Sequence, residues 1–335
     1  MKRSQTTMLD VANAAGVSLK TVSRVINDEP GVTPAKVALV EAAIAALGYE
    51  RNDIAASLRS GAKSRTVGLV IEDVANPFYA VVAQAVEDVA REHASLLITT
   101  SAREDAERER QLVTALLRRR VDALLIVPAG PDHSYIASTG FAGNTVFLDR
   151  PPANTEADTV LVDNAVGAEI AVAHLLRYGH QRIAIVGDAM SLYTAQERLT
   201  GYRHALAAGG ARLDEGLISM GHGTLDSARE AVNELMALPV ERRPTAVFTA
   251  NNRCTIGALH ALEADRGHLA LVGFDEFELA DLLGVTVVRT DPYRMGQVAA
   301  ELALGTTSGE GPHHARRVIV PVELVPRGSG EIPAS

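Results

Sequence analysis

The stretch TMLDVANAAGVSLKTVSRVIND (residues 7–28) contains two short helical patterns that meet at Gly16. Gly16 suits the tight turn between two steeply crossing helices, because a glycine has no Cβ to clash there. Ser18 stands at the N-cap position of the second pattern. The face expected to be buried carries Met8, Val11, Ala12 and Ala15 on the first helix and Val22, Val25 and Ile26 on the second. The stretch therefore predicts two helices packed across a turn.

Burying this face leaves four side chains outward on the first half of the second helix: Leu19, Lys20, Thr21 and Arg24. In a helix-turn-helix this half of the second helix reads base edges in a major groove. Arg and Lys suit guanine there, and Thr suits a thymine methyl group or a phosphate. A helical hairpin with a solvated basic face is the alternative that the pattern leaves open.

A third helix is predicted from Thr33 and Pro34, with Pro at the first helical position, to Leu47, where Gly48 ends it. Beyond it, 53–59 can form only two helical turns before Gly61 and a polar linker. So short a helix is marginal alone in water, and we expect it to order on a partner.

Length and composition indicate a folded protein of more than one domain. The chain has 335 residues, of which 47% are hydrophobic and 22% charged, which excludes disorder of the whole chain. No apolar run reaches the length of a membrane span and the first residues lack a signal-peptide core, so we expect a cytoplasmic protein. Cys254 stands alone and cannot form an intramolecular disulfide or a cysteine-based zinc site, so we expect a buried thiol.

The charge is unevenly distributed along the chain. Residues 1–65 carry nine Lys or Arg and six Asp or Glu, which gives this segment a net charge of +3. The whole chain has a net charge of −9, so residues 66–335 carry −12. A small basic head suits contact with phosphate, whereas the acidic body is repelled by nucleic acid.

The body alternates apolar runs with amphipathic stretches of helical length. Continuous Val, Ile and Leu runs with this spacing predict parallel sheets covered by helices on both faces, here in two doubly wound α/β lobes. The runs expected to form strands are 66–73, 95–101, 122–129, 144–150, 182–188, 245–252 and 269–276.

DVANAAGVSLKTVSRVIN (residues 10–27) closely resembles the headpiece of the LacI family of bacterial transcription repressors, and IAASLRSG (54–61) resembles its hinge helix. The resemblance implies that Leu58 is an apolar wedge, inserted by paired hinge helices into the minor groove, which would kink the operator. Packing between linker and body is the alternative role for Leu58. DNA contacts are implied for Ser18, Leu19, Lys20, Thr21, Arg24 and Asn27.

The resemblance extends over nearly the whole chain and implies a core similar to periplasmic ribose-type sugar-binding proteins, in which the chain crosses three times between lobes. The domains expected are a helix-turn-helix headpiece at 1–51, a hinge helix and linker at 52–65, an effector-binding core at 66–329 and a tail at 330–335. One lobe is expected to comprise about 66–160 and 292–316, and the other 161–291 and 317–329.

Ligands of such folds bind beyond the carboxyl ends of the strands, where this chain places polar and aromatic side chains. A polyol needs carboxylates and amides for its hydroxyls, an Arg fork to bridge two of them, and an aromatic face. The predicted effector ligands, partly implied by the resemblance, are Asn76, Phe78, Tyr79, Asp149, Arg150, Tyr193, Arg198, Asn251, Asp275 and Thr290.

Each of these residues also has a structural interpretation. Asp149 and Arg150 can form an ion pair at the rim, and Asp275 can cap a turn. Asp163 and Asn164 are expected to cap the helix beginning at Ala165 rather than to touch a ligand.

An enzyme is the main alternative from another functional class. The sequence lacks a G-x-G-x-x-G after a strand, a G-x-x-x-x-G-K-[ST] loop and a G-x-S-x-G elbow, and its ten His show no metal-ligand spacing. We therefore expect no catalysis, no cofactor and no metal. A free-standing sugar-binding protein would lack the first sixty residues.

The family resemblance predicts a homodimer on a near-palindromic operator, most simply the repressor of a carbohydrate-utilisation operon with a small sugar as effector. A nucleoside or purine acting as corepressor is the alternative with the same architecture. Nothing after Val325 has the leucine heptads of a tetramerisation helix.

Overall fold

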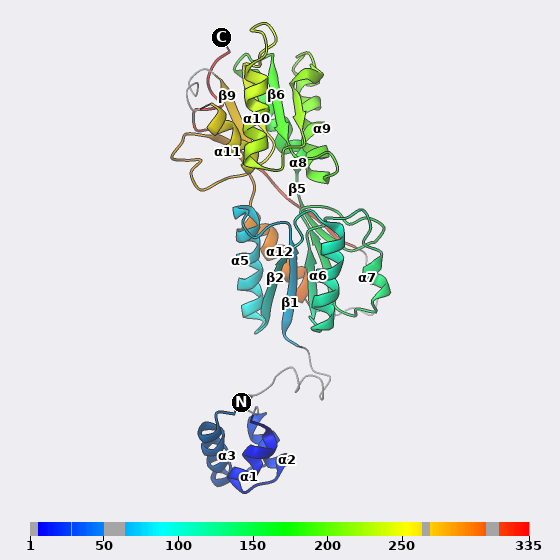
Figure 1. The fold of residues 1–335 in the computed structure, drawn as a ribbon, viewed down its shortest axis with the longest axis vertical. Coiled ribbons are helices and arrows are strands. Elements are labelled where there is room, and N and C mark those ends of the chain that lie inside the picture. The colour runs from blue at the N-terminus through cyan, green and yellow to red at the C-terminus, as the bar shows by residue number, and fades with distance from the viewer. Residues whose placement is uncertain (1–5, 28, 50–63, 263–268, 306–314, 335) are drawn as a thin grey trace. The chain divides into compact units, whose positions relative to one another are not determined.

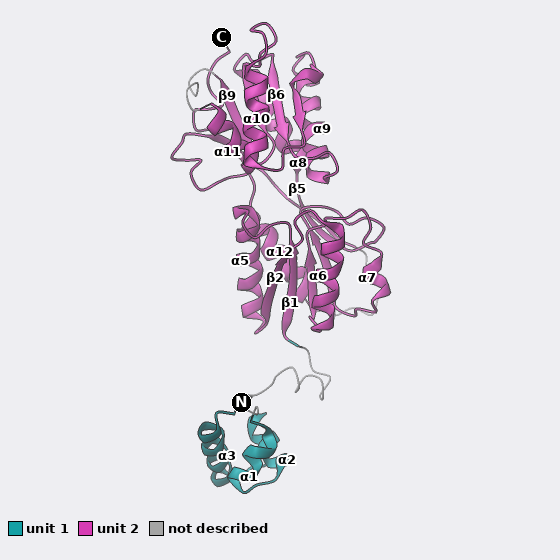
Figure 2. Ribbon diagram, in the orientation of Figure 1, with its two compact units in different colours: residues 1–64 teal, residues 65–335 magenta. Residues whose placement is uncertain are grey.

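The computed structural model describes residues 6–27, 29–49, 64–262, 269–305 and 315–334. The chain divides into two compact units, Met1–Ser64 and Arg65–Ser335 (Figure 2). Residues 52–63 of the predicted hinge, and with them Leu58, lie outside the described residues.

The first unit is a three-helix headpiece made of α1 (Met8–Ala15), α2 (Leu19–Ile26) and α3 (Pro34–Leu47). Each helix has a local reason to begin or end. Thr7 and Asp10 form a reciprocal capping box at the start of α1, and Gly16 ends it in the left-handed region at φ 63°. Pro34 occupies the first turn of α3, although the Thr33 side chain makes no capping hydrogen bond.

The core of the headpiece confirms the predicted apolar face. Val11, Val22 and Val40 each come from a different helix and are 0% exposed, and Ala12 and Ala15 fill the space beside them. Small residues allow α1 and α2 to approach closely, while the polar side chains of α2 stay outside.

The first lobe of the second unit, which carries the labels β1, β2, α5, α6, α7 and α12 in Figure 1, is built on a fully parallel six-stranded sheet. The strand order is β11-β5-β4-β3-β1-β2. Its strands are β1 (Thr66–Ile71), β2 (Leu96–Ser101), β3 (Ala123–Ile126), β4 (Asn144–Leu148), β5 (Asp158–Val162) and β11 (Arg317–Val320). Its helices are α5 (Pro77–Glu92), α6 (Ala106–Arg118), α7 (Tyr135–Ser138) and α12 (Pro292–Leu304).

Apolar side chains of β1 point to both faces of this sheet. Val67, Leu69 and Ile71 pack with residues of α5 and α12, whereas Val70 packs with residues of α6 on the other face. All four are 0% exposed, which is the physical reason for a continuous rather than alternating apolar run.

The second lobe repeats this plan on a sheet in the order β12-β10-β9-β8-β6-β7, in which only β12 runs antiparallel to its neighbour. Its strands are β6 (Ile183–Gly187), β7 (Ile218–Met220), β8 (Ala246–Thr249), β9 (Ala270–Phe274), β10 (Thr286–Arg289) and β12 (Glu323–Val325). Its helices are α8 (Asn164–Arg177), α9 (Tyr193–Ala208), the 3-10 turn η1 (Glu215–Leu217), α10 (Leu225–Met236) and α11 (Asn252–Ala261).

The chain passes between the two sheets three times: after β5, after β10 and after β11. The third crossing corrects the predicted lobe boundary, which assigned everything from 317 to the second lobe. β11 pairs in parallel with β5 and therefore completes the first sheet before 321–322 lead to β12. The first crossing is also slightly later than predicted, because β5 extends to Val162.

The predicted tail at 330–335 is tied to the second lobe as far as it is described. Glu331 accepts a hydrogen bond from the Thr286 hydroxyl at 2.8 Å and pairs with His174. His180 lies 2.8 Å from the Ile332 carbonyl oxygen. These contacts hold residues 331–332 against the second lobe.

Among the described residues, no helix is both long enough and apolar enough to cross a membrane.

Gly201 offers a test of the packing between α8 and α9. A Cβ at this position would lie 2.1 Å from the Ala165 carbonyl oxygen, which is backbone and cannot move aside cheaply. We expect Gly201→Ala to lower the free energy of unfolding by about 1–3 kcal/mol, measured by urea denaturation. Ala207→Ser, at an exposed position of the same helix, is the control, and equal midpoints for the two variants would contradict this packing.

Candidate DNA interface and ligand cavity

The N-terminal half of α2 presents the predicted DNA-contacting side chains on the surface of the headpiece. The Ser18 hydroxyl caps the helix by accepting a hydrogen bond from the Thr21 backbone N–H at 3.2 Å, as predicted. Leu19 is 46% exposed, Lys20 is exposed beside it, and Val22 fixes the opposite face in the core. The helix thus offers one polar, basic edge to a partner.

Arg24 and Asn27 continue this edge. The Arg24 Nε lies 3.8 Å from Glu29, and both side chains are about half exposed. An exposed ion pair of this kind contributes about 1 kcal/mol at most, so Arg24 can exchange it for a base or a phosphate. Asn27 is exposed at the end of α2, with its amide 3.4 Å from the Ser23 hydroxyl.

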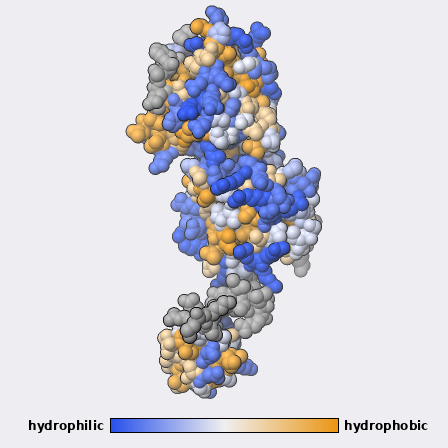
Figure 3. All heavy atoms as spheres, viewed as in Figure 1, coloured by the Kyte–Doolittle hydropathy of each residue, from blue (hydrophilic) through white to orange (hydrophobic). Residues whose placement is uncertain are grey.

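A cavity of about 330 Å³ lies between the two lobes, at the carboxyl ends of the parallel strands. Hydrophilic residues predominate on the face shown in Figure 3 where these lobes meet. The cavity collects eight of the ten predicted effector ligands: Asn76, Phe78, Tyr79, Asp149, Arg150, Arg198, Asn251 and Asp275. Their role as ligands remains a prediction.

Arg150 organises the wall formed by the first lobe. Its Nη1 and Nη2 donate to the two carboxylate oxygens of Glu104, each at 2.6 Å, and Nη1 also donates to the Pro128 carbonyl at 3.0 Å. The Nε lies 3.4 Å from Asp149, which accepts a hydrogen bond from the Tyr79 hydroxyl at 3.0 Å. The pair predicted between Asp149 and Arg150 is therefore present, but it lies inside the cavity wall and is buried.

Asp149 and Asp275 occupy equivalent places in the two lobes. Each directly follows a central strand, β4 or β9, and each has a left-handed backbone, with φ of 64° and 69°. Asp tolerates this region better than most residues but is still strained there. With this backbone conformation both carboxylates line the same cavity.

Arg198 reaches the cavity from α9 and organises the wall formed by the second lobe. Its Nε donates to the Asn164 side-chain oxygen at 2.8 Å, its Nη1 donates to the Ala250 carbonyl, and its guanidinium lies 3.8 Å from the centre of the Phe274 ring. Nη1 is also 3.5 Å from Asp275. Burial raises the pKa of the Asp275 carboxyl, and the nearby Arg198 charge counteracts the rise.

The helix that follows β5 divides the predicted roles of Asp163 and Asn164. Asp163 caps α8 by accepting a hydrogen bond from the Val166 N–H at 3.4 Å, as predicted. Asn164 is already helical and only 2% exposed, and its side chain supports Arg198 instead.

Asp188 and Asn251 face each other across the ends of β6 and β8. The Asn251 amide donates a hydrogen bond to Asp188, and the Asn251 oxygen caps α11 by accepting from the Cys254 N–H at 2.6 Å. Burial raises the pKa of the Asp188 carboxyl, and the Asn251 hydrogen bond counteracts the rise. Cys254 is buried, as expected.

Two predicted ligands do not line the cavity. Thr290 lies behind Asp275, and its hydroxyl donates a hydrogen bond to the carboxylate at 3.1 Å. The short Thr290 side chain does not extend past this carboxylate into the cavity. The Tyr193 hydroxyl accepts a hydrogen bond from Arg317 at 3.1 Å, which directs it away from the cavity toward β11. Both predictions are corrected in this respect.

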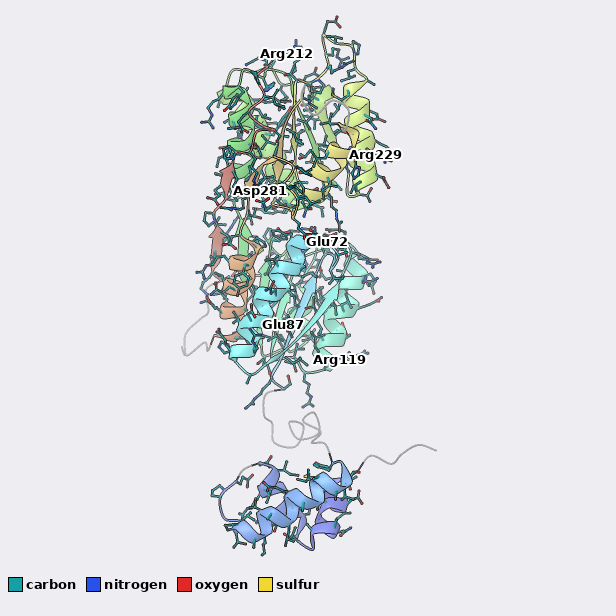
Figure 4. The ribbon with its side chains drawn as sticks, turned by 90° about the vertical axis from the view of Figure 1, so that its left-hand side faces the viewer. Glu72, Glu87, Arg119, Arg212, Arg229 and Asp281 are labelled. Atoms are coloured by element: carbon teal, nitrogen blue, oxygen red, sulfur yellow. The ribbon has the colours of Figure 1, made fainter. Side chains whose placement is uncertain are left out.

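Arg253 joins the two lobes at the cavity. From the start of α11 it lies 3.2 Å from Glu72 and 2.6 Å from Asp73, both at the end of β1. Nearby, the Asn252 amide donates to the Asn76 side-chain oxygen at 3.0 Å. Figure 4 shows Glu72 at the end of the first lobe that faces the second.

Sequence reasoning missed several polar residues of the lining. A signal existed for Glu72 and Asp188, because each directly follows a strand, as the predicted ligands Asp149 and Asp275 do. Glu104 and Arg253 lie farther from their strand ends, and only the fold brings them to the cavity. The missed polar residues are Glu72, Glu104, Asp188, Ser191, Thr194, Asn252 and Arg253.

No group of three or more metal-ligating side chains occurs within the part of the chain that the structure describes. The cavity instead offers hydrogen-bond donors and acceptors around a partly apolar space, which is suited to binding a small polar molecule.

The fold and the site define a class of protein: a helix-turn-helix domain followed by a two-lobed core like that of the periplasmic binding proteins. Comparisons with known proteins are consistent with both parts. Residues 7–52 match bacterial regulatory proteins of the lacI family, and residues 64–325 match the periplasmic binding proteins and sugar binding domain of the LacI family.

Curated relatives are similar over nearly their full length. The chain is 32% identical to the HTH-type transcriptional regulator GalR of Escherichia coli, over 98% of this chain and 96% of that protein. It is 30% identical to the ribose operon repressor of the same species, over 96% of this chain and 99% of the relative. The chain therefore belongs to the LacI family and is a DNA-binding transcriptional regulator, since its relatives are regulators and not enzymes.

Solved structures support the same assignment. The lac repressor dimer bound to operator and the anti-inducer ONPF matches with a TM-score of 0.84 and 26% identity, over 98% of this chain and 99% of that one. The complex of the transcriptional regulator CelR with cellobiose matches with a TM-score of 0.70 and 30% identity, over 97% and 100%.

The Asp188 carboxyl predicts how stability depends on pH. Its pKa in the folded protein lies above the ordinary 3.8, so the folded state holds this proton more tightly, and stability is lost as pH rises through the raised value. Asp188→Asn removes this loss of stability with rising pH, and it keeps a side-chain oxygen that can accept the hydrogen bond from the Asn251 amide. We expect its melting temperature to exceed wild type by about 2 °C at pH 7.5, with a smaller difference near pH 4.

Thermal unfolding between pH 4 and pH 8 measures this effect. Asp226→Asn is the control, because Asp226 is an exposed residue of the same lobe. A variant at Asp188 that is less stable than wild type at pH 7.5 would show that the carboxylate is favourably solvated or paired.

Proposed function

We propose that this protein is the repressor of a carbohydrate-utilisation operon. It binds a near-palindromic operator as a homodimer in the bacterial cytoplasm, and a small sugar in the interlobe cavity changes its affinity for DNA. The observation that carries this proposal is the pairing of an exposed basic edge on α2 with a cavity whose walls come from both lobes.

The DNA-binding part rests on the placement of Ser18, Leu19, Lys20, Thr21, Arg24 and Asn27 along one exposed edge. A two-fold dimer presents two such edges to successive major grooves, which accounts for a palindromic site. The lac repressor relative was solved as a dimer on its operator, which supports the same arrangement.

The effector part rests on the chemistry of the cavity wall. Asp149 and Asp275 can accept hydrogen bonds from hydroxyl groups of a ligand, Arg198 can bridge neighbouring oxygens, and Phe78 offers an aromatic face, while Arg150 holds Asp149 and Glu104 in the wall. Fixed planar groups of this kind suit a ring that carries several hydroxyls. A sugar is also what the relatives named for ribose and cellobiose suggest.

The coupling between effector binding and DNA binding follows from the position of the cavity between the two lobes. A ligand that touches both lobes favours one arrangement of the lobes, and its effect on DNA affinity equals the ratio of its affinities for the two arrangements. The predicted hinge at 52–65 connects the core to the headpiece and would transmit the difference.

The experiment that tests the function is retention of promoter DNA. Purified full-length protein is mixed with fragments upstream of its own and neighbouring reading frames, with and without a panel of pentoses, hexoses, polyols and nucleosides. We expect one fragment to be retained and one compound to change its retention. Indifference to every fragment under every condition would overturn the proposal.

Leu58→Ala tests the proposed minor-groove wedge. We expect operator affinity to fall at least about tenfold while effector affinity stays unchanged, because the variant loses the side chain that holds the kink. Fluorescence anisotropy with the retained promoter fragment measures the first, and calorimetry the second. Leu213→Ala, at an exposed leucine of the core, is the control. Unchanged operator affinity in Leu58→Ala would remove the wedge.

Arg198→Ala tests the proposed effector site. We expect the variant to retain promoter DNA but to lose its response to the effector, because Arg198 holds the wall of the second lobe together and faces the cavity. Arg203→Ala, an exposed position of the same helix, should respond like wild type. A normal response in Arg198→Ala would place the effector elsewhere.

A further inference from the structure

The cavity carries more acid than base. Its lining has five carboxylates and three guanidiniums, and neither Lys nor His is among the lining residues, so the formal balance is −2. The acids are Glu72, Glu104, Asp149, Asp188 and Asp275, and the bases are Arg150, Arg198 and Arg253. A ligand therefore enters a field that opposes negative charge.

The three guanidiniums are already paired with acids. Arg150 forms a bidentate pair with Glu104, at 2.6 Å for both oxygens. Arg253 pairs with Glu72 and with its neighbour Asp73, and Arg198 lies 3.5 Å from Asp275. An anionic ligand at Arg150 or Arg253 would have to take the guanidinium from a carboxylate that then remains unpaired in a partly buried site.

Asp188 differs from the other acids of the lining. Its hydrogen-bond partner is the neutral amide of Asn251, and none of the described cations forms an ion pair with it, although Arg198 and Arg150 attract it from a longer distance. Asp188 directly follows β6, and its side chain lines the cavity. Two oxygens with one amide donor leave lone pairs for further donors.

We infer that the effector is an unphosphorylated, carboxylate-free molecule that presents hydroxyl or amine donors to Asp188, and that Asp188 is the residue that excludes phosphorylated sugars. The inference rests on the proposed function, and it narrows the class of effector from sugars in general to those without a phosphate or carboxylate group. Donors from the ligand satisfy the free lone pairs of Asp188, whereas a phosphate near it meets like charge in a poorly solvated space.

The first test compares matched pairs of compounds on the full-length protein by calorimetry. The pairs are ribose with ribose 5-phosphate, galactose with galactose 6-phosphate, and cellobiose with cellobiose 6-phosphate. We expect every phosphate to bind at least about tenfold more weakly than its parent sugar. A phosphate that binds more tightly than its parent, in a manner that Arg198→Ala abolishes, would overturn the inference.

The second test needs no knowledge of the effector and decides the question if none of the six compounds binds. Its probe is sulfate, compared with chloride at equal ionic strength. Sulfate stabilises folded proteins in general because it is excluded from their surface, so the effect on wild type is the reference. Asp188→Lys should gain a larger sulfate-dependent rise in melting temperature than wild type, and Asp188→Asn a rise between the two. Glu234→Lys makes the same change of net charge at an exposed site of the same lobe, near the C-terminal end of α10, and should gain no more than wild type.

Two results of the second test count against the inference. The first is that sulfate stabilises wild type as much as it stabilises the Asp188 variants. The second is that Asp188→Asn and Asp188→Lys are folded by circular dichroism but gain no more from sulfate than Glu234→Lys does. Promoter retention is measured on the same samples. If a sugar phosphate binds the cavity and changes retention, the proposed function stands and only the exclusion by Asp188 fails.

Discussion

Parallel pairing of the strands is the constraint on which the rest of the structure depends. In each lobe it places the carboxyl ends of the central strands at one edge, so the short polar segments after β1, β4, β6, β8 and β9 gather around one cavity. The central strands β1, β3, β4, β6, β8 and β9 are apolar on both faces and contain no charged residue. Polar chemistry is thereby confined to the strand ends, where charged groups are partly buried and each must find partners.

The two lobes solve this pairing problem in the same way. Asp149 and Asp275 both have left-handed backbones, and each accepts a hydrogen bond from a buried hydroxyl, Tyr79 at 3.0 Å or Thr290 at 3.1 Å. Each also lies about 3.5 Å from the guanidinium of its own lobe. The contacts offset the strain and hold both carboxylates rigid, so a ligand meets acceptors that are already oriented.

The sequence predicted the strands that are long and continuously apolar, and it predicted the strand-end residues Asp149, Arg150 and Asp275 at the cavity. It did not predict β5, β7, β10, β11 or β12, which have three to five residues each and depend on their neighbours in the sheet. Tyr193 and Thr290 were misplaced because side-chain direction and length decide whether a residue near a strand end reaches the cavity. Glu104 and Arg253 were missed because an ion pair depends on distances that only the tertiary fold sets.

Interlobe contacts determine what a ligand can do to such a molecule. Arg253 binds Glu72 and Asp73 across the lobes, and Asn252 binds Asn76, so the arrangement of lobes described here is stabilised before any ligand arrives. A ligand with equal affinity for every arrangement would shift nothing, however tightly it bound. Because walls from both lobes surround the cavity, a ligand that fills it loses contacts whenever the lobes separate. The composition of the two walls, more than the volume between them, therefore sets the free energy available for a change in DNA affinity.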